Sequence, residues 1–210
     1  MELTVHEFLT IDGVMQGPGG GDEDPSGGFT RGGWLVPFTD EDFGAIVTGW
    51  FGRAEAILLG RTTYSMMHPY WSQITDPDNL VAAKLNGLPK YVASSTLRDP
   101  AWHNTTVLSG DVIGQVKQLK QQPGGELQVH GSWGLARSLH QAGLIDEYRL
   151  LVAPVTVGAG KRLFTEDAPA RGYTLVDSRT TSRGAVYSAL RPAPFEVGRI
   201  GEVVEGRESA

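Results

Sequence analysis

The fold of this chain is decided by the stretch VHGSWGLARSLHQAGLIDEYRLLVAPVTVGAGKRLF, residues 129–164. It predicts the end of a strand, a glycine turn, a helix, a second strand and a glycine-rich exit loop. Ser132 suits the N-cap of the helix, where its hydroxyl would accept a hydrogen bond from a first-turn N–H group. Leu135 and Leu139 lie on one helical face, and the mostly apolar residues 148–153 are typical of a strand covered on both faces. We therefore expect a strand–helix–strand unit of an α/β sheet.

The turn between strand and helix in this stretch can bind an anion. A helix that begins at Gly131-Ser132, directly after a strand, presents several unpaired backbone N–H groups at the positive end of its dipole. A phosphate or pyrophosphate is the natural occupant, although the glycine can equally serve only to make a tight turn. Residues 56–64 repeat the pattern, with a strand followed by Gly60, Arg61, Thr62 and Thr63. The chain therefore holds two candidate anion sites.

The composition restricts the class of protein. The 210 residues, 40% hydrophobic and 20% charged, suit one globular domain with an ordinary core. A net charge of −6 argues against nucleic acid as the main partner, and no apolar run approaches the ~20 residues of a membrane span. The absence of cysteine excludes disulfides and thiolate chemistry. We expect a soluble cytoplasmic protein with a small-molecule substrate and no nucleic-acid or membrane partner.

Strands and helices alternate along the rest of the chain. We expect strands over residues 3–9, 56–59, 90–93 and 105–108, helices over 39–51, 80–85 and 111–122, and a closing antiparallel hairpin over 173–190. This order indicates a mixed-sheet α/β domain. The glycine-rich residues 12–33 form a loop of a length that is uncommon unless it serves as a lid, a binding loop or a disordered insertion.

Several familiar motifs are incomplete in this chain. Gly160-Lys161 suggests a phosphate-binding P-loop, but that motif needs Gly where Val155 stands and Ser or Thr where Arg162 stands. A nucleophile elbow at Ser132 would need an acid and then a histidine later in the chain, and because the last histidine is His140 that order cannot be met. The five histidines form no i, i+4 pair, so we predict no metal site and interpret each as a surface or satisfied polar residue.

Four segments together match the motifs of one known family. They are TIDGV at 10–14, LGRTTY at 59–64, ASS at 93–95, and GLIDE with PVTVGAG at 143–147 and 154–160. They resemble the S-x-D-G, M-G-R-x-T-[WY], GLVDE and P-x-x-x-G-x-G patterns of the dihydrofolate-reductase-like family. The resemblance is to the branch that contains the reductase domain of riboflavin biosynthesis and its stand-alone bacterial relatives. It implies a three-layer α/β/α fold with a central mixed, mostly parallel sheet and a C-terminal antiparallel hairpin.

The same resemblance implies a reductase domain over residues 1–192, a tail over 193–210 that we expect to be flexible, a homodimer, and NADPH as cofactor. The residues implied to hold the cofactor are Gly131, Ser132, Trp133 and Gly134 for the pyrophosphate, Gly60, Arg61, Thr62 and Thr63 for the adenosine-side phosphates, and Ser94, Ser95 and Thr96 for the adenosine end. Asp12-Gly13 and the loop after them resemble the segment that covers the nicotinamide. An arginine flanked by hydroxyl groups is a good partner for a 2′-phosphate, which favours NADPH over NADH.

The chain departs from the family pattern at His130, where a glycine is common. Its side chain would either narrow the pyrophosphate site or point away from it. Hydride addition to a C=N bond is assisted by a carboxyl of raised pKa in an apolar pocket. The candidates are Asp42, then Asp40, both of which also fit as helix-capping acids, and Asp12 on the side of the lid.

These observations predict an NADPH-dependent reductase of a small heterocyclic (pterin- or pyrimidine-like) or carbonyl substrate. The alternative is a non-catalytic nucleotide-binding module of the same fold. Lys161 and Arg162 would hold a substrate phosphate or belong to a solvated loop. A fused zinc deaminase domain is excluded, because its cysteine ligands are missing.

Overall fold

The computed structural model describes residues 1–198, 203–204 and 207–208. The strands are β1 (Glu2–Thr10), β2 (Ala54–Gly60), β3 (Lys90–Ala93), β4 (Thr105–Leu108), β5 (Glu126–His130), β6 (Glu147–Ala153), β7 (Gly172–Thr180), β8 (Val186–Ala193), β9 (Val203–Val204) and β10 (Arg207–Glu208). The helices are α1 (Glu41–Gly52), α2 (Arg61–Trp71), α3 (Leu80–Gly87), α4 (Val112–Gln121) and α5 (Trp133–Gln141), with 3-10 turns η1 (Ser26–Gly28) and η2 (Val36–Phe38).

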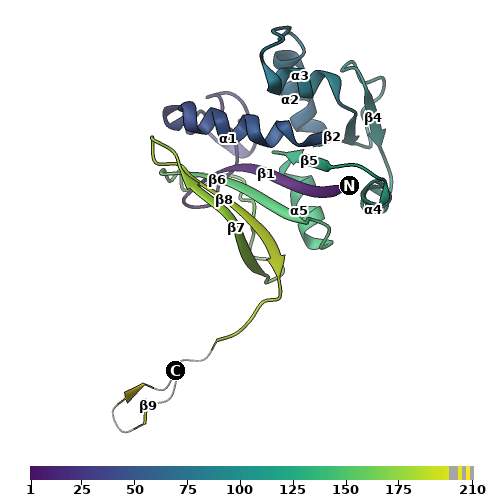
Figure 1. Cartoon of the computed structure of the whole chain (residues 1–210). Helices are drawn as coiled ribbons and strands as arrows, with labels where there is room; N and C mark the ends of the chain where they lie inside the picture. The colour runs from purple at the N-terminus through teal and green to yellow at the C-terminus, as the bar shows by residue number, and fades with distance from the viewer. Residues whose placement is uncertain (199–202, 205–206, 209–210) are drawn as a thin grey trace.

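Eight strands form one sheet in the order β4-β3-β2-β5-β1-β6-β8-β7. The strands from β4 to β6 are all parallel, and β8 and β7 close the sheet as an antiparallel hairpin. Helices α1, α2 and α3 cover one face of this sheet, whereas α4 and α5 cover the other (Figure 1). The predicted three-layer α/β/α fold with a mostly parallel sheet and a C-terminal hairpin is confirmed.

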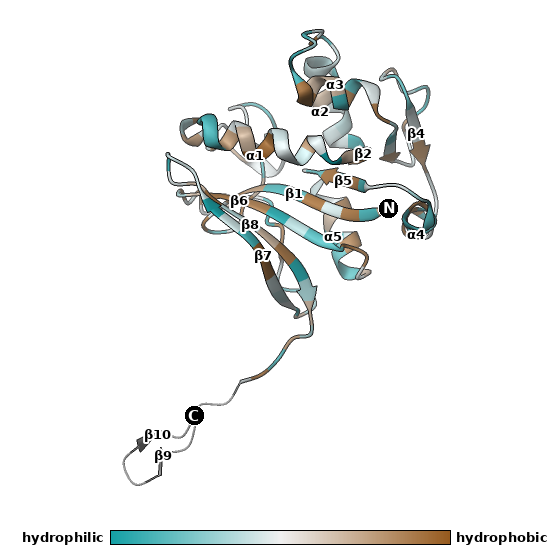
Figure 2. Cartoon of the chain, in the orientation of Figure 1, coloured by the Kyte–Doolittle hydropathy of each residue, from teal (hydrophilic) through white to brown (hydrophobic). Residues whose placement is uncertain are grey.

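The central strands are buried on both faces, as parallel strands between two helical layers must be. In β2, Ile57 and Leu59 pack with residues of α1, α2 and α3, whereas Leu58 packs with residues of α4 and α5. Figure 2 accordingly shows brown, hydrophobic segments on β1, β2 and β5. The apolar runs of the sequence therefore form two cores that share the sheet.

Local signals placed several helix ends correctly. Asn79 caps α3 by accepting a hydrogen bond from the Ala82 N–H group at 2.9 Å. Gly143 has φ +65° just after α5, where a left-handed residue ends a helix.

Strand β8 continues to Ala193, one residue past the predicted domain boundary. The flexibility expected for residues 193–210 remains a prediction, and much of that segment lies outside the described residues. In the part of the chain that the structure describes, no helix has the length and apolarity needed to cross a bilayer.

Candidate active site

The two predicted anion sites lie side by side. Strands β2 and β5 are hydrogen-bonded parallel neighbours, so the turns that lead from them into α2 and α5 meet at the same sheet edge. The Gly60 N–H group donates to Ser132 Oγ at 2.9 Å, and the Ser132 N–H group donates to Thr63 Oγ1 at 3.0 Å. The chain leaves β2 toward β3 and leaves β5 in the opposite direction toward β6. Ligands of open α/β sheets bind at such a switch point.

Both helices begin without a side-chain cap. Ser132 has φ +63°, and its hydroxyl accepts from Gly60 and donates to the His130 carbonyl at 3.1 Å. The prediction that this hydroxyl caps α5 was wrong, because the left-handed backbone turns it toward the neighbouring strand end. The first-turn N–H groups of α5 and α2 therefore remain available to an anion.

The two helix starts open on a cavity of about 330 Å³. Its wall is formed by β1, the two turns and the lid loop, which we define as residues 12–33. The lining residues are His6, Glu7 and Phe8 from β1, Gly60, Arg61, Thr62, Thr63 and Met66 from the α2 side, His130, Gly131, Ser132, Trp133, Gly134 and Leu135 from the α5 side, Met15, Gln16, Gly17, Pro18, Glu23 and Asp24 from the lid loop, and Lys161.

The lid loop is held over the cavity by polar contacts. Lys161 Nζ donates to Asp24 Oδ2 at 2.6 Å and to Ser26 Oγ at 2.7 Å. Gln16 accepts from the Lys161 N–H group at 3.0 Å and donates to the Asp24 and Ser26 carbonyls, while Trp34 Nε1 donates to the Gln16 carbonyl. Of the three interpretations of this loop, these contacts favour an ordered cover.

Asp12 fastens the base of the lid loop. Its carboxylate accepts from the Thr10 hydroxyl at 2.6 Å and from the Val157 and Gly158 N–H groups at 3.2 and 2.7 Å. Burial alone would raise the pKa of Asp12, but these hydrogen bonds together lower it. Arg162 donates to the Asp12 and Gly158 carbonyls, which supports the loop interpretation for this arginine over a phosphate-binding role.

Asp40 and Asp42 join the start of α1 to the β7–β8 turn. Asp40 accepts from the Phe43 N–H group at 2.7 Å and from the Arg183 N–H group at 2.7 Å, and the first of these contacts is the main cause of its lowered pKa. Asp42 accepts from the N–H and hydroxyl groups of Ser182. Both carboxylates are outside the residues that line the cavity. This placement favours the capping role, and the catalytic assignment stays a prediction.

The remaining predicted cofactor residues, Gly13 and residues 94–96, are outside the cavity lining. Gly13 has φ +77° in the turn at the base of the lid loop. Ser94 is buried, and its hydroxyl accepts from the Thr96 and Leu97 N–H groups. Ser95 and Thr96 are exposed at the end of β3, next to β2. The structure thus brings the α2 and α5 residues together in one cavity and leaves residues 94–96 outside its lining, at the end of the strand next to β2.

Sequence reasoning missed Glu7, which is only 2% exposed and lines the cavity. Its Oε1 atom is buried without a hydrogen-bond partner, and burial raises the pKa of its carboxyl well above the usual value. A signal was present: in a strand, Glu7 points to the same face as Val5 and Leu9, which the alternation assigns to the core.

Two histidine rings lie stacked at the edge of the cavity. The centroids of His6 and His130 are 4.7 Å apart, and His130 stacks on Phe51 of α1 at 4.4 Å. Burial, with the charge of Arg149, lowers the pKa of His130 to about 3, and burial also lowers that of His6. The interpretation of all histidines as surface or satisfied residues was wrong for His6 and His140, because Nδ1 of His6 and Nε2 of His140 are buried without a hydrogen-bond partner. The His130 ring lies on the α1 face of the sheet, away from the α5 turn.

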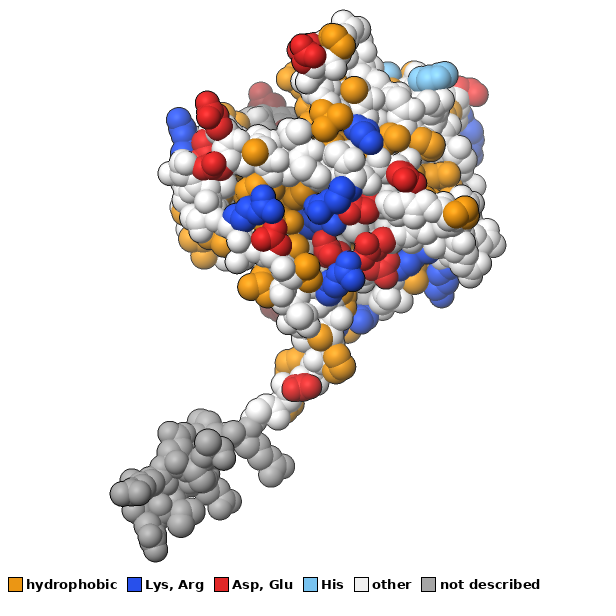
Figure 3. Space-filling model, in the orientation of Figure 1, with side chains coloured by type: hydrophobic (Ala, Val, Ile, Leu, Met, Phe, Trp, Pro, Cys, Tyr) orange, Lys and Arg blue, Asp and Glu red, His pale blue; other side chains and the backbone are white. Residues whose placement is uncertain are grey.

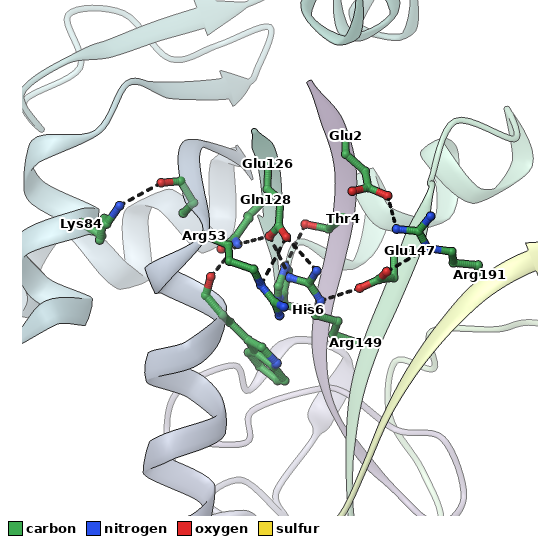
Figure 4. A network of polar contacts seen from close by, with 12 residues as sticks. Glu2, Thr4, His6, Arg53, Lys84, Glu126, Gln128, Glu147, Arg149 and Arg191 are labelled. Carbon is green, nitrogen blue, oxygen red and sulfur yellow. Dashed lines mark hydrogen bonds and ion pairs between the residues drawn. The ribbon is translucent and has the colours of Figure 1, made fainter. Parts of the chain in front are cut away.

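A buried ion network fixes this edge of the cavity (Figure 4). Arg149 donates to both carboxylate oxygens of Glu126 at 2.7 Å and to Glu147 at 2.7 Å. Gln128 Nε2 donates to Glu126 at 2.6 Å, so Gln128 Oε1 faces His130 Nε2 at 3.1 Å. Since that oxygen can only accept, His130 carries its proton on Nε2. On the surface of the molecule seen in Figure 3, basic and acidic side chains lie next to one another.

These features define the class of the protein. An eight-stranded mixed sheet with a C-terminal hairpin, two uncapped helix starts at its switch point and a lid loop is the dihydrofolate-reductase-like α/β fold.

The chain belongs to the RibD C-terminal domain family, whose model matches residues 2–187. It is 28% identical over 184 residues to the "Uncharacterized protein YyaP" of Bacillus subtilis (strain 168), covering 85% of this chain and 88% of that protein.

Two solved structures share the fold. A pyrimidine reductase-like protein from Corynebacterium diphtheriae NCTC superposes with a TM-score of 0.60 at 13% identity, covering 92% of each chain. Dihydrofolate reductase from Enterococcus faecalis, complexed with NADP(H), superposes with a TM-score of 0.58 at 12% identity, covering 91% of this chain and 96% of that one.

Proposed function

We propose that this protein is an NADPH-dependent reductase that transfers a hydride to a small heterocyclic, pterin- or pyrimidine-like, or carbonyl substrate. The observation that carries the proposal is the pair of uncapped helix starts, joined through Ser132, that open on one covered cavity. Membership of the RibD C-terminal domain family and the fold shared with an NADP(H)-bound dihydrofolate reductase support it.

The residues at the cavity fit a phosphorylated dinucleotide. The free N–H groups of residues 133–135 suit a pyrophosphate, and Gly131, with φ +56°, lets the backbone approach it. Arg61 is exposed at the start of α2 beside Thr62 and Thr63. Its guanidinium suits the bidentate recognition of a 2′-phosphate. Ser95 and Thr96 follow β3, the strand next to β2, and would contact the adenosine end of the cofactor.

The chain's own groups would then set the conditions for hydride transfer. The bound cofactor supplies the hydride, and the lid loop, held by Lys161 and Gln16, excludes water from the cavity. The buried carboxyl of Glu7 in the cavity wall favours a catalyst over a module that only binds nucleotide.

Equilibrium titration tests cofactor choice. Arg61→Ala should raise the Kd for NADPH about 10- to 100-fold, the equivalent of losing one charge-assisted hydrogen-bonded contact, and should leave the Kd for NADH nearly unchanged. Arg179→Ala on the exposed face of β7 is the matched control, because it also removes a guanidinium but lies outside the cavity lining. Equal NADPH affinities in both variants would contradict the proposed 2′-phosphate site.

Catalysis is tested by the loss of nicotinamide absorbance with dihydrofolate, intermediates of riboflavin biosynthesis and simple carbonyl compounds. We expect NADPH oxidation with at least one of these substrates. Tight NADPH binding without oxidation across the panel would instead support the non-catalytic module.

A further inference from the structure

We propose that Glu7 is the catalytic acid of this site: its carboxyl hydrogen-bonds to the substrate atom that becomes protonated and supplies that proton during hydride transfer. The inference rests on the proposed reductase function and assigns the role to a residue that lines the cavity, whereas Asp12, Asp40 and Asp42 are outside its lining.

Glu7 lies on β1 just beyond the point where the neighbouring strand β5 ends. The pairing of β1 with β5 ends at His6 and His130, whereas the pairing of β1 with β6 continues to Thr10 and Ala153. The edge of β1 from Glu7 onward therefore has no β5 partner, and the cavity occupies this position. A ligand at the two helix starts would face this open edge.

The surroundings of Glu7 keep its carboxyl neutral. Its face of β1 also carries Val5 and Leu9, and the nearby cavity wall includes Met15 and Leu135, which pack in the same core as Val5 and Leu9. No ion pair involves Glu7 in the described part of the chain, and Oε1 lacks a hydrogen-bond partner there. A buried acid without a cation retains its proton at neutral pH.

Two other buried carboxyls of this chain, unlike that of Glu7, are paired with arginines. Glu126 is 7% exposed and receives two hydrogen bonds from Arg149, and Glu147 is 4% exposed and is paired with Arg149 and Arg191. The fold thus provides cations for buried carboxylates away from the cavity and leaves Glu7 without one. Because an unpaired buried polar group costs stability, a role for it in ligand binding explains why it is unpaired.

The proposed step combines a hydride transfer with a proton transfer from Glu7. A hydride from the dihydronicotinamide adds to the carbon of a C=N or C=O group of the substrate, which is reduced while NADPH is oxidised to NADP⁺. The O–H bond of Glu7 breaks, its proton bonds to the substrate nitrogen or oxygen, and the carboxylate takes a new proton from water when the lid loop opens. Asp12 and Asp40 suit this role less, because their pKa values are lowered.

The proposal predicts a pH dependence that originates in Glu7. The other titratable groups that line the cavity are His6, His130, Arg61, Lys161, Glu23 and Asp24. Burial lowers the pKa of both histidines, and the ion pair of Lys161 with Asp24 lowers the pKa of that aspartate against the effect of burial. The decline in kcat at high pH should therefore follow the ionisation of Glu7.

The test compares Glu7→Gln and Glu7→Asp with the wild-type protein, and uses Glu41→Gln on the exposed surface of α1 as the control. Glu7→Gln should bind NADPH with a Kd within about threefold of wild type, lose about 10²- to 10⁴-fold in kcat, and lose the high-pH decline. Glu7→Asp should restore part of kcat. Glu41→Gln should behave as wild type.

The outcomes separate the two proposals. Wild-type protein that binds NADPH and reduces nothing would overturn the reductase function and the role of Glu7 with it. Wild-type turnover that Glu7→Gln retains, with an unchanged pH profile, would overturn the inference alone. An infrared carbonyl band of a protonated acid at pH 7, present in wild type and missing in Glu7→Gln, is expected independently of turnover, and its absence would also overturn the inference.

Discussion

Replacing Glu7 with glutamine should change how the stability of the fold depends on pH. The carboxyl has a pKa in the folded protein that burial raises well above its value in the unfolded chain. The protonated carboxyl of Glu7 therefore makes its full contribution to the unfolding free energy below about pH 4.3, the pKa of glutamate in the unfolded chain. That contribution is lost as the pH rises toward the pKa of Glu7 in the folded protein. Glutamine does not titrate, so the variant lacks this loss.

The magnitude follows from proton linkage. Within this window the unfolding free energy of wild type should fall by about 1.4 kcal/mol per pH unit relative to the variant. Two pH units therefore give a difference of about 2.7 kcal/mol, which is about 5–10 °C in Tm for a chain of this size. Any cost of burying the unpaired amide is independent of pH, so it shifts the difference by a constant. The histidines whose pKa burial lowers, His6, His130 and His140, titrate in both proteins, so their contributions cancel in the difference.

Urea unfolding followed by tryptophan fluorescence, without cofactor, measures this difference from pH 4.5 to pH 8. A difference in unfolding free energy between wild type and Glu7→Gln that stays constant from pH 4.5 to pH 8 would refute the claim that Glu7 is buried and neutral. A difference of opposite slope would show that the fold stabilises the carboxylate, as it does for the ion-paired glutamates.

Two further substitutions test the architecture around the site. Ser132→Ala removes the acceptor for the Gly60 N–H group and should cost about 1–3 kcal/mol in urea unfolding, whereas Ser132→Gly should cost less because glycine adopts the left-handed backbone freely; equal losses would contradict the strain at this residue. Arg149→Met leaves the buried Glu126 carboxylate without its main cation and should cost about 3–5 kcal/mol, against about 0–1 kcal/mol for Arg179→Met in an exposed pair, and similar losses in both variants would contradict the importance of burial.

The sequence determined the elements of this fold because their signals are local. The helix that follows Gly131, the cap at Asn79 and the left-handed end at Gly143 each depend on residues within one or two turns of the chain. The order of strands and helices then indicated a mixed α/β sheet, and the motif segments led to the family. Both glycine turns of the candidate site were found in the same way.

Only the tertiary structure decided how these pieces form a site. The hydroxyl of Ser132 binds the neighbouring turn, a partner 72 residues away in the chain that no local pattern indicates. Glu7 enters the cavity because β5 ends at His130 while β1 continues, and because the lid loop packs over the gap. Burial and charge compensation depend on segments far apart in sequence, so the neutral acid and its unpaired oxygen could be recognised only once the chain was folded.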